Sequence, residues 1–246
     1  MTVWLPLGFF ATALLYASVG FGGGSTYSAL LALVGFNYKL LPIVSLACNI
    51  LVVTGSTIRF ARGGVIPWRK ALLVSLIAAP LAFLGGLTPI KQATFLVVLG
   101  LSLVGAGLAL LLPRAPEAET QPLPAARYMA WAAAPLGYLA GLVGIGGGIF
   151  LAPLLHLTRW ARAREIAATT SLFILINSVS GLIGQLAKNG PERFGEALGG
   201  ALPLLIAVVL GGQLGSVLAL RFLPEKVIRW LTAALTIWAG SRLLLG

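Results

Sequence analysis

Eight apolar blocks separated by short polar connections account for most of this chain of 246 residues. They fall near residues 3–35, 40–60, 68–87, 92–112, 127–156, 165–187, 197–221 and 227–245. A helix needs about 20 apolar residues to span a bilayer, so most blocks predict a single membrane-spanning helix. Because a spanning helix satisfies its own backbone hydrogen bonds in lipid, the pattern predicts an all-α integral membrane protein.

The low fraction of charged residues also indicates that the chain folds in lipid. Only 9% of the residues are charged, against about 25% in a typical soluble domain. The net charge of +11 comes from small basic clusters between the apolar blocks. This placement indicates an oriented membrane protein in contact with anionic lipids, and it argues against a nucleic-acid partner. The lone Cys48 predicts no disulfide, and because the first block lacks the flanks of a signal peptide we expect it in the mature protein.

Two blocks are longer than one span requires, and each contains a glycine cluster. The first has "VGFGGGSTYSALL" over residues 19–31, and the fifth has "VGIGGGIFLAPLL" over residues 143–155. Glycine weakens a helix by about 1 kcal/mol relative to alanine. Two such clusters therefore predict two breaks in otherwise helical segments.

The two halves of the chain form a predicted internal repeat. The second glycine cluster follows the first at an offset of 124 residues. At an offset of 126, Ser45-Leu46 matches Ser171-Leu172, Gly55 matches Gly181, and Gly64 matches Gly190. A stretch rich in Pro, Ala and Glu separates the halves. We therefore expect an N-terminal membrane repeat over 1–112, a linker loop over 113–126, and a C-terminal membrane repeat over 127–246.

The basic residues test how the long blocks cross the membrane. If all eight blocks span, the 17 Lys and Arg residues divide eight against nine, without bias. If the first and fifth blocks are re-entrant hairpins, the same 17 divide twelve against five, which agrees with the positive-inside rule. Three spans then remain in each half, and this odd number inverts one half relative to the other. The predicted multi-pass protein lies in a bacterial cytoplasmic (inner) membrane with both termini on the extracytoplasmic side.

The predicted fold is therefore two inverted repeats, each a glycine-broken re-entrant helical hairpin followed by three transmembrane helices. After each break a half-helix should begin, near Ser25 in the first half and near Ile149 in the second. Its first N–H groups lack partners and lie at the positive end of the helix dipole, so they suit an anion. The alternative is that the glycines only allow close helix packing.

The helices after the hairpins supply further polar candidates, of which Asn49 and Asn177 are the strongest because a buried amide needs a partner. Hydrogen bonding between helices is the alternative role for both. Ser25 and Thr26 would cap the first half-helix or donate to a ligand. The candidate substrate-binding residues are Gly22, Gly23, Gly24, Ser25, Thr26, Asn49, Gly146, Gly147, Gly148, Ile149 and Asn177. Replacing Gly23 by Val should abolish binding and leave the protein inserted.

Two ionisable residues have competing interpretations. Arg59, near the end of its block, would face the anion pathway or extend to the membrane interface. His156 would relay protons or lie at the interface. The chain has no aspartate, and its glutamates lie outside the middles of the blocks. We therefore predict no catalytic residue, no cofactor and no metal site.

The motif from Gly144 to Pro153, GxGGGxxxxP, resembles the signature of the TauE/SafE family of sulfite and organosulfonate exporters. The likeness extends to "TTSLFILINSVSG" over residues 169–181 and to the duplicated arrangement, although Ala29 replaces the proline in the first copy. The resemblance implies export of a small sulfur-containing anion, such as sulfite or a short organosulfonate. The residues themselves support a small anion.

The predicted function is thus secondary transport by alternating access, with no enzymatic activity. Its partners would be a small anionic substrate and anionic membrane lipids, and a homodimer remains open. An anion channel of the same architecture is one alternative. A second is an intramembrane serine protease with Ser180 as the nucleophile, in "SVSG", and His156 as the base.

Overall fold

The computed structural model describes residues 4–19, 22–112, 124, 128–218 and 225–245, and every regular element among them is a helix. The first half contains α1 (Trp4–Val19), α2 (Gly24–Leu33), α3 (Leu41–Arg62), α4 (Trp68–Leu87) and α5 (Gln92–Leu111). The second half contains α6 (Met129–Val143), α7 (Gly148–Leu157), α8 (Ala163–Gly200), α9 (Leu202–Leu218) and α10 (Glu225–Leu245). Of these helices, α3, α4, α5 and α8 are long and apolar enough to cross a membrane. The predicted all-helical class is confirmed for the described residues, and these four helices are consistent with a membrane protein.

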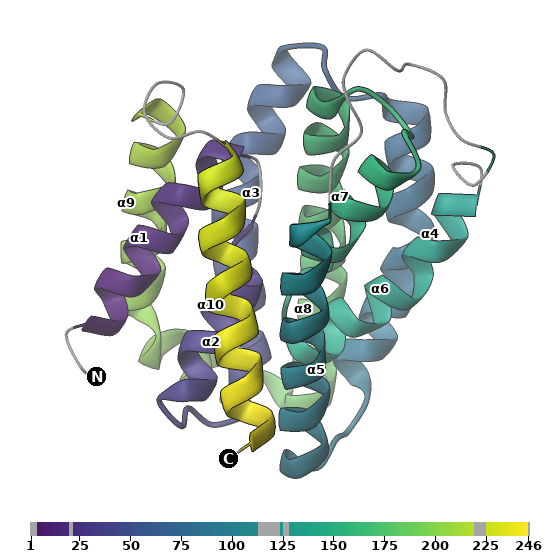
Figure 1. Ribbon diagram of the computed structural model, residues 1–246. Helices are drawn as coiled ribbons and strands as arrows, with labels where there is room; N and C mark the ends of the chain where they lie inside the picture. The colour runs from purple at the N-terminus through teal and green to yellow at the C-terminus, as the bar shows by residue number, and fades with distance from the viewer. Residues whose placement is uncertain (1–3, 20–21, 113–123, 125–127, 219–224, 246) are drawn as a thin grey trace.

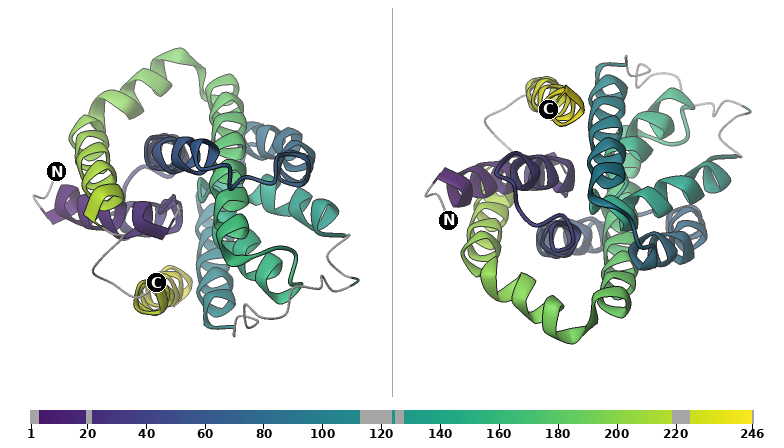
Figure 2. Two further views of the ribbon diagram at one scale, coloured as in Figure 1. Left: turned by 90° about the horizontal axis from the view of Figure 1, so that it is seen from above. Right: turned by 90° about the horizontal axis from the view of Figure 1, so that it is seen from below.

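The longer helices run along one common direction, so several appear end-on when the molecule is viewed from above or below (Figure 2). In the orientation of Figure 1, α3 and α5 run upward and α4 runs downward. In the second half these directions are reversed, since α8 and α10 run downward and α9 runs upward.

The short helices pair into two hairpins that open in opposite directions. In Figure 1, α1 runs upward and α2 returns to the lower end, where the chain continues into α3. By contrast, α6 runs downward and α7 returns to the upper end, where the chain continues into α8. Both predicted breaks are therefore turning points of the chain. The predicted linker 113–126, apart from Pro124, and Gly20 of the first cluster lie outside the described residues.

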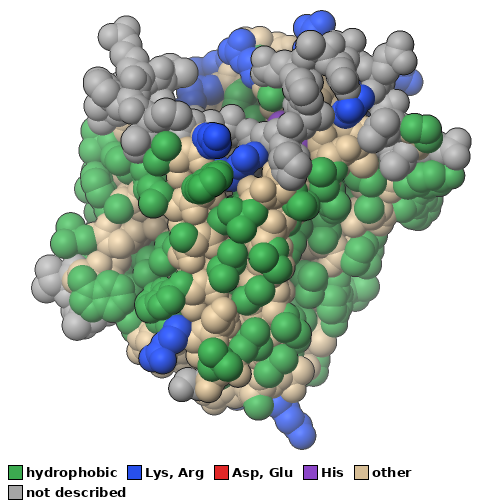
Figure 3. Space-filling model, viewed as in Figure 1, with side chains coloured by type: hydrophobic (Ala, Val, Ile, Leu, Met, Phe, Trp, Pro, Cys, Tyr) green, Lys and Arg blue, Asp and Glu red, His purple; other side chains and the backbone are tan. Residues whose placement is uncertain are grey.

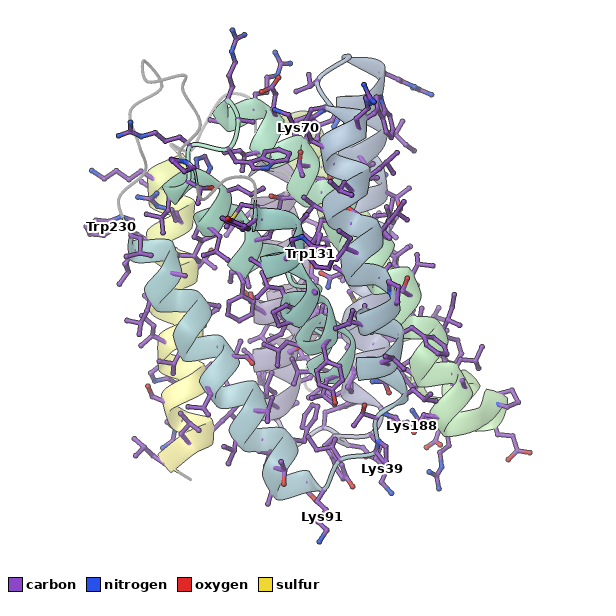
Figure 4. All side chains as sticks on the ribbon, turned by 90° about the vertical axis from the view of Figure 1, so that its right-hand side faces the viewer. Lys39, Lys70, Lys91, Trp131, Lys188 and Trp230 are labelled. Carbon is purple, nitrogen blue, oxygen red and sulfur yellow. The ribbon has the colours of Figure 1, made fainter. Side chains whose placement is uncertain are left out.

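Basic residues gather at the upper end of the molecule. Figure 3 shows them above a broad hydrophobic band, with few at the lower end of that face. Lys70 lies at the upper end, whereas Lys39, Lys91 and Lys188 lie at the lower end (Figure 4). Trp131, which lies between the levels of Lys70 and Lys188 in Figure 4, is 71% exposed, as expected of a side chain that faces lipid.

The helix α8 extends beyond the expected block 165–187, because residues 188–200 are also helical. Gly190 interrupts it with φ 80° and ψ 165°, and Pro191 follows. Only glycine adopts this backbone conformation readily, and proline then starts the next helical segment. The kink separates the apolar part of α8 from a short polar helical segment that leads into α9.

The centre of the molecule is formed by α3 and α8, which pack against each other. The first helix of each hairpin packs beside this pair. Helix α1 packs on α9, and α6 packs on α4. Glycines permit close approach there, since a Cβ on Gly141 would meet the Ala82 carbonyl and a Cβ on Gly215 would meet the Leu14 carbonyl. Close packing of helices, the alternative role of the glycine clusters, thus also occurs at glycines outside the clusters.

Candidate functional site

The two half-helices begin at the glycine clusters. Helix α2 starts at Gly24 and α7 at Gly148, each one residue before the predicted start. The preceding residues, Gly23 and Gly147, have φ of 79° and 74°, a left-handed conformation that costs other residues about 1–2 kcal/mol. These glycines are therefore required by the backbone turn itself.

No side chain caps either half-helix. The predicted capping role of Ser25 and Thr26 is wrong, because Gly23 occupies the N-cap position and both residues lie inside the first turn of the helix. The Thr26 hydroxyl instead lies 2.9 Å from the hydroxyl of Tyr16 on α1. The first N–H groups of α2 and α7 consequently have no partner within their helices and receive none from a capping side chain.

The two glycine loops meet at the side chain of Asn49, which projects from α3. A Cβ placed on Gly22 would lie 2.5 Å from Asn49 Oδ1, and one on Gly146 would lie 2.6 Å from Asn49 Nδ2. A Cβ on Gly24 would meet the same amide and the backbone carbonyl of Ile145. Residues about 124 positions apart in the sequence thus surround one amide group. We call this place the loop junction and define it by Gly22, Gly24, Asn49 and Gly146.

Ser45 connects the same loops one turn earlier on α3. Its Oγ lies 3.0 Å from the carbonyl oxygen of Gly24 and 2.8 Å from that of Gly144. It also accepts a hydrogen bond of 3.0 Å from Ser28 Oγ on α2. Since a hydroxyl carries one hydrogen, Ser45 shares it between two carbonyls that belong to different halves of the chain.

The Asn49 amide is the most unusual group in this region. The residue is completely buried, and neither its Nδ2 nor its Oδ1 has a hydrogen-bond partner. Leaving a buried polar group unsatisfied costs about 1–3 kcal/mol, and most such groups in folded proteins do find partners. An amide left unpaired between two helix N-termini is therefore the strongest candidate here for contact with a ligand.

Further buried groups without partners lie on the two central helices. They are Thr57 Oγ1 on α3, and Thr169 Oγ1, Thr170 Oγ1, Asn177 Oδ1 and Ser178 Oγ on α8. The buried polar residues of the described chain include no Lys, Arg, Asp or Glu. Any charge at the loop junction is thus compensated by neutral dipoles: amides, hydroxyls and the N-termini of α2 and α7.

Asn177, the predicted residue from α8, has a hydrogen-bond partner on its own helix. Asn177 Nδ2 donates to the Phe173 carbonyl of its own helix at 2.8 Å, and Asn177 is not among the nearest neighbours of any loop glycine. Ile174, one turn away, takes that place: its Cγ2 would lie 3.1 Å from a Cβ on Gly22 and 3.1 Å from one on Gly146. Ile149 is buried in the first turn of α7.

Two residues beside the glycine loops, Ile174 and Tyr27, carry little signal in the sequence. Nothing in the sequence distinguishes Ile174 from the other apolar residues of its block. Tyr27, which stacks on Phe9 with 4.8 Å between ring centroids, has a buried hydroxyl without a partner. The only signal for Tyr27 is its position one turn after Gly23.

The residues with competing interpretations lie elsewhere. Arg59 is exposed in the last turn of α3, and His156 is half-buried in the last turn of α7. Ser180 borders a surface groove between α4 and α8 whose other lining residues are apolar: Leu76, Ala79, Pro80, Phe83, Leu84 and Ile183. His156 does not line that groove, so the structure gives no support to a Ser180–His156 pair.

Comparison with known proteins places this chain in a family. The model of the sulfite exporter TauE/SafE family matches residues 4–243. The probable membrane transporter protein y4hK of Sinorhizobium fredii is 34% identical over 253 aligned residues, which cover 98% of this chain and 97% of that protein. A probable membrane transporter protein of Xylella fastidiosa is 28% identical over 218 residues, covering 83% of this chain and 80% of the relative. No solved structure matches the chain.

Proposed function

The chain belongs to the TauE/SafE family of membrane transporters, and from this premise we propose that it exports a small sulfur-containing anion. The proposed substrate is sulfite or a short organosulfonate, and the proposed mechanism is alternating access without enzymatic chemistry. The observation that carries this proposal is the unpaired Asn49 amide at the meeting point of two glycine loops. Each of those loops leads into the N-terminus of a half-helix.

The substrate-binding residues of this proposal come from both halves. The N–H groups of Gly24, Ser25 and Thr26 and those of Gly148 and Ile149 would donate to anionic oxygens, because they occupy the first turns of α2 and α7. Gly22, Gly23, Gly146 and Gly147 would shape the loops. Asn49 would contact the anion directly, and Asn177 would line the path of the anion along α8.

An inverted repeat supports alternating access. Exchanging α1–α5 with α6–α10 maps the most extensive helix contacts onto one another: α1 on α9 becomes α6 on α4, and α3 on α9 becomes α8 on α4. The pairs α3–α8 and α5–α10 map onto themselves. In secondary transporters such halves exchange conformations around a site at their interface. We propose the same two halves, 1–112 and 127–246, as the moving units, joined by the linker 113–126.

The proposed orientation follows from charge. The upper end of Figure 1, which carries most of the basic residues, would face the cytoplasm and the anionic lipids of its leaflet. The proposed location is the inner membrane of a bacterium. Both the first turn of α1 and the last turn of α10 lie towards the lower end of Figure 1, which would be the extracytoplasmic side.

Membrane voltage is the proposed driving force. Moving one elementary charge through 100 mV is worth about 2.3 kcal/mol, and the negative interior of the cell favours export of anions. None of the buried polar residues of the described chain is a carboxylate that would couple the anion to a proton.

Reconstitution tests this proposal. Proteoliposomes loaded with labelled sulfite or ethanesulfonate should release it faster when potassium and valinomycin make the interior negative. Release that follows an imposed pH gradient and ignores the voltage would contradict voltage-driven export. Saturable counterflow of unlabelled anion is expected of a transporter, whereas single-channel currents would indicate a channel.

A further inference from the structure

The loop junction makes two opposite demands on whatever occupies it, and both come from Asn49. Its Nδ2 needs a hydrogen-bond acceptor, and its Oδ1 needs a donor. The demand does not depend on which way the amide is turned, because both atoms are buried and neither has a partner. A ligand that satisfies the whole amide must therefore both accept and donate a hydrogen bond.

A bare oxyanion meets only one of these demands. Its oxygens accept from Nδ2 and from the N–H groups at the starts of α2 and α7. The same oxygens would, however, repel Asn49 Oδ1, because both are acceptors whose lone pairs would face each other. An oxygen that still carries its hydrogen, or a hydroxyl group elsewhere on the ligand, would donate to Oδ1 and remove this repulsion.

The charge of the surroundings restricts the ligand further. The buried polar residues of the described chain include no basic side chain, so only dipoles oppose the charge of a bound anion. Burying a second negative charge without a cation is expensive. The apolar Ile174 forms part of the wall at Gly22 and Gly146. The junction is thus better suited to a monoanion than to a dianion.

We propose that the loop junction selects monoanions that carry their own hydrogen-bond donor. Hydrogen sulfite would bind in preference to the sulfite dianion, and a hydroxyl-bearing sulfonate in preference to a plain alkanesulfonate. Asn49 is the residue that determines this selectivity. This inference rests on the proposed anion transport and specifies its substrate class.

A matched pair of sulfonates tests the inference at a single pH. The compounds 2-hydroxyethanesulfonate and ethanesulfonate are both ionised monoanions and differ by one hydroxyl group. Calorimetric titration of the full-length purified protein should show about tenfold tighter binding of the hydroxyl compound. This is the usual effect of one hydrogen bond to a buried acceptor that otherwise has no partner.

Two variants assign the preference to Asn49. Leucine is similar in size to asparagine but has no polar group. In Asn49→Leu the two sulfonates should therefore bind with about equal affinity. In Asn49→Asp both affinities should fall, because a carboxylate repels either anion. The matched control is Asn189→Leu, since the Asn189 amide bonds only within α8, to the Gln185 carbonyl at 2.9 Å and the Gln185 side chain at 3.1 Å. This variant should keep the wild-type ratio.

The outcomes separate the inference from the function on which it rests. If neither the two sulfonates nor sulfite binds the wild-type protein, the proposed anion transport is wrong. If both sulfonates bind equally, the anion site stands and the donor requirement is wrong. A preference that persists in Asn49→Leu would overturn the role of Asn49.

Discussion

At the scale of single residues, the glycines of each cluster have different tasks. Gly23 and Gly147 provide the left-handed backbone from which the half-helices start. Gly22 and Gly146 instead leave room for the Asn49 amide, which any side chain there would displace. Replacing Gly23 by Val would therefore strain the loop backbone as well as the site, and the resulting loss of binding would have two causes. Gly22 offers the cleaner substitution.

We expect Gly22→Ala to weaken anion binding about tenfold, the effect of one lost hydrogen bond to a charged ligand. The added methyl group would lie 2.5 Å from Asn49 Oδ1, the end of a side chain that can turn away. Isothermal titration with sulfite measures the effect. The control is Gly195→Ala, where a Cβ meets nothing within 4 Å. Unchanged affinity in Gly22→Ala would place the binding site away from the junction.

At the scale of elements, α3 carries the residues that join the two hairpins. Ser45 contacts Gly24 of the first loop and Gly144 at the end of α6, and Asn49 follows one turn later on the same helix. Helix α8, its partner at the centre, contributes Ile174 at the corresponding place. The junction thus has one polar and one apolar wall, so the two halves contribute unequally to the site.

Replacing Ser45 by Ala should lower the free energy of unfolding by about 1–3 kcal/mol, because two buried carbonyls lose a shared donor. Thermal unfolding of the detergent-solubilised protein measures this change. Ser56→Ala is the matched control on the same helix, since Ser56 bonds only to the Val53 carbonyl of its own helix, at 3.1 Å, and should cost little. Equal effects of the two substitutions would show that Ser45 does not join the loops.

At the scale of the whole molecule, the two hairpins determine the topology. Each returns the chain to the end from which it came, so the basic connections after α3 and before α8 share the upper end (Figure 1). Lys39 and Lys91 remain at the lower end (Figure 4). If each hairpin spanned the membrane once, this separation of charge would disappear.

Single cysteines test the orientation in intact cells. In a Cys48→Ala background, Lys39→Cys and Lys91→Cys should react with a membrane-impermeant maleimide added outside. Arg69→Cys should react only after the cells are opened. Labelling of Arg69→Cys from outside would contradict the proposed orientation.

The sequence determined the solvent, the helical class and the places where the chain turns, because these depend on local composition. A chain with 9% charged residues cannot cover its surface in water, and the two GxGGG clusters interrupt the helices that contain them. It also indicated the starts of α2 and α7 to within one residue.

Only the tertiary structure decided which groups meet. It placed Asn49 between the loops, directed Asn177 to its own helix and brought Ile174 to the junction. Asn49 and Asn177 look equivalent in the sequence, because each is an amide in the apolar helix that follows a hairpin. The direction of a side chain on a helix depends on its position around the helix axis. The rotation and packing of α3 and α8 therefore decide which neighbours each amide faces. These contacts depend on residues from both halves, and local sequence does not encode them.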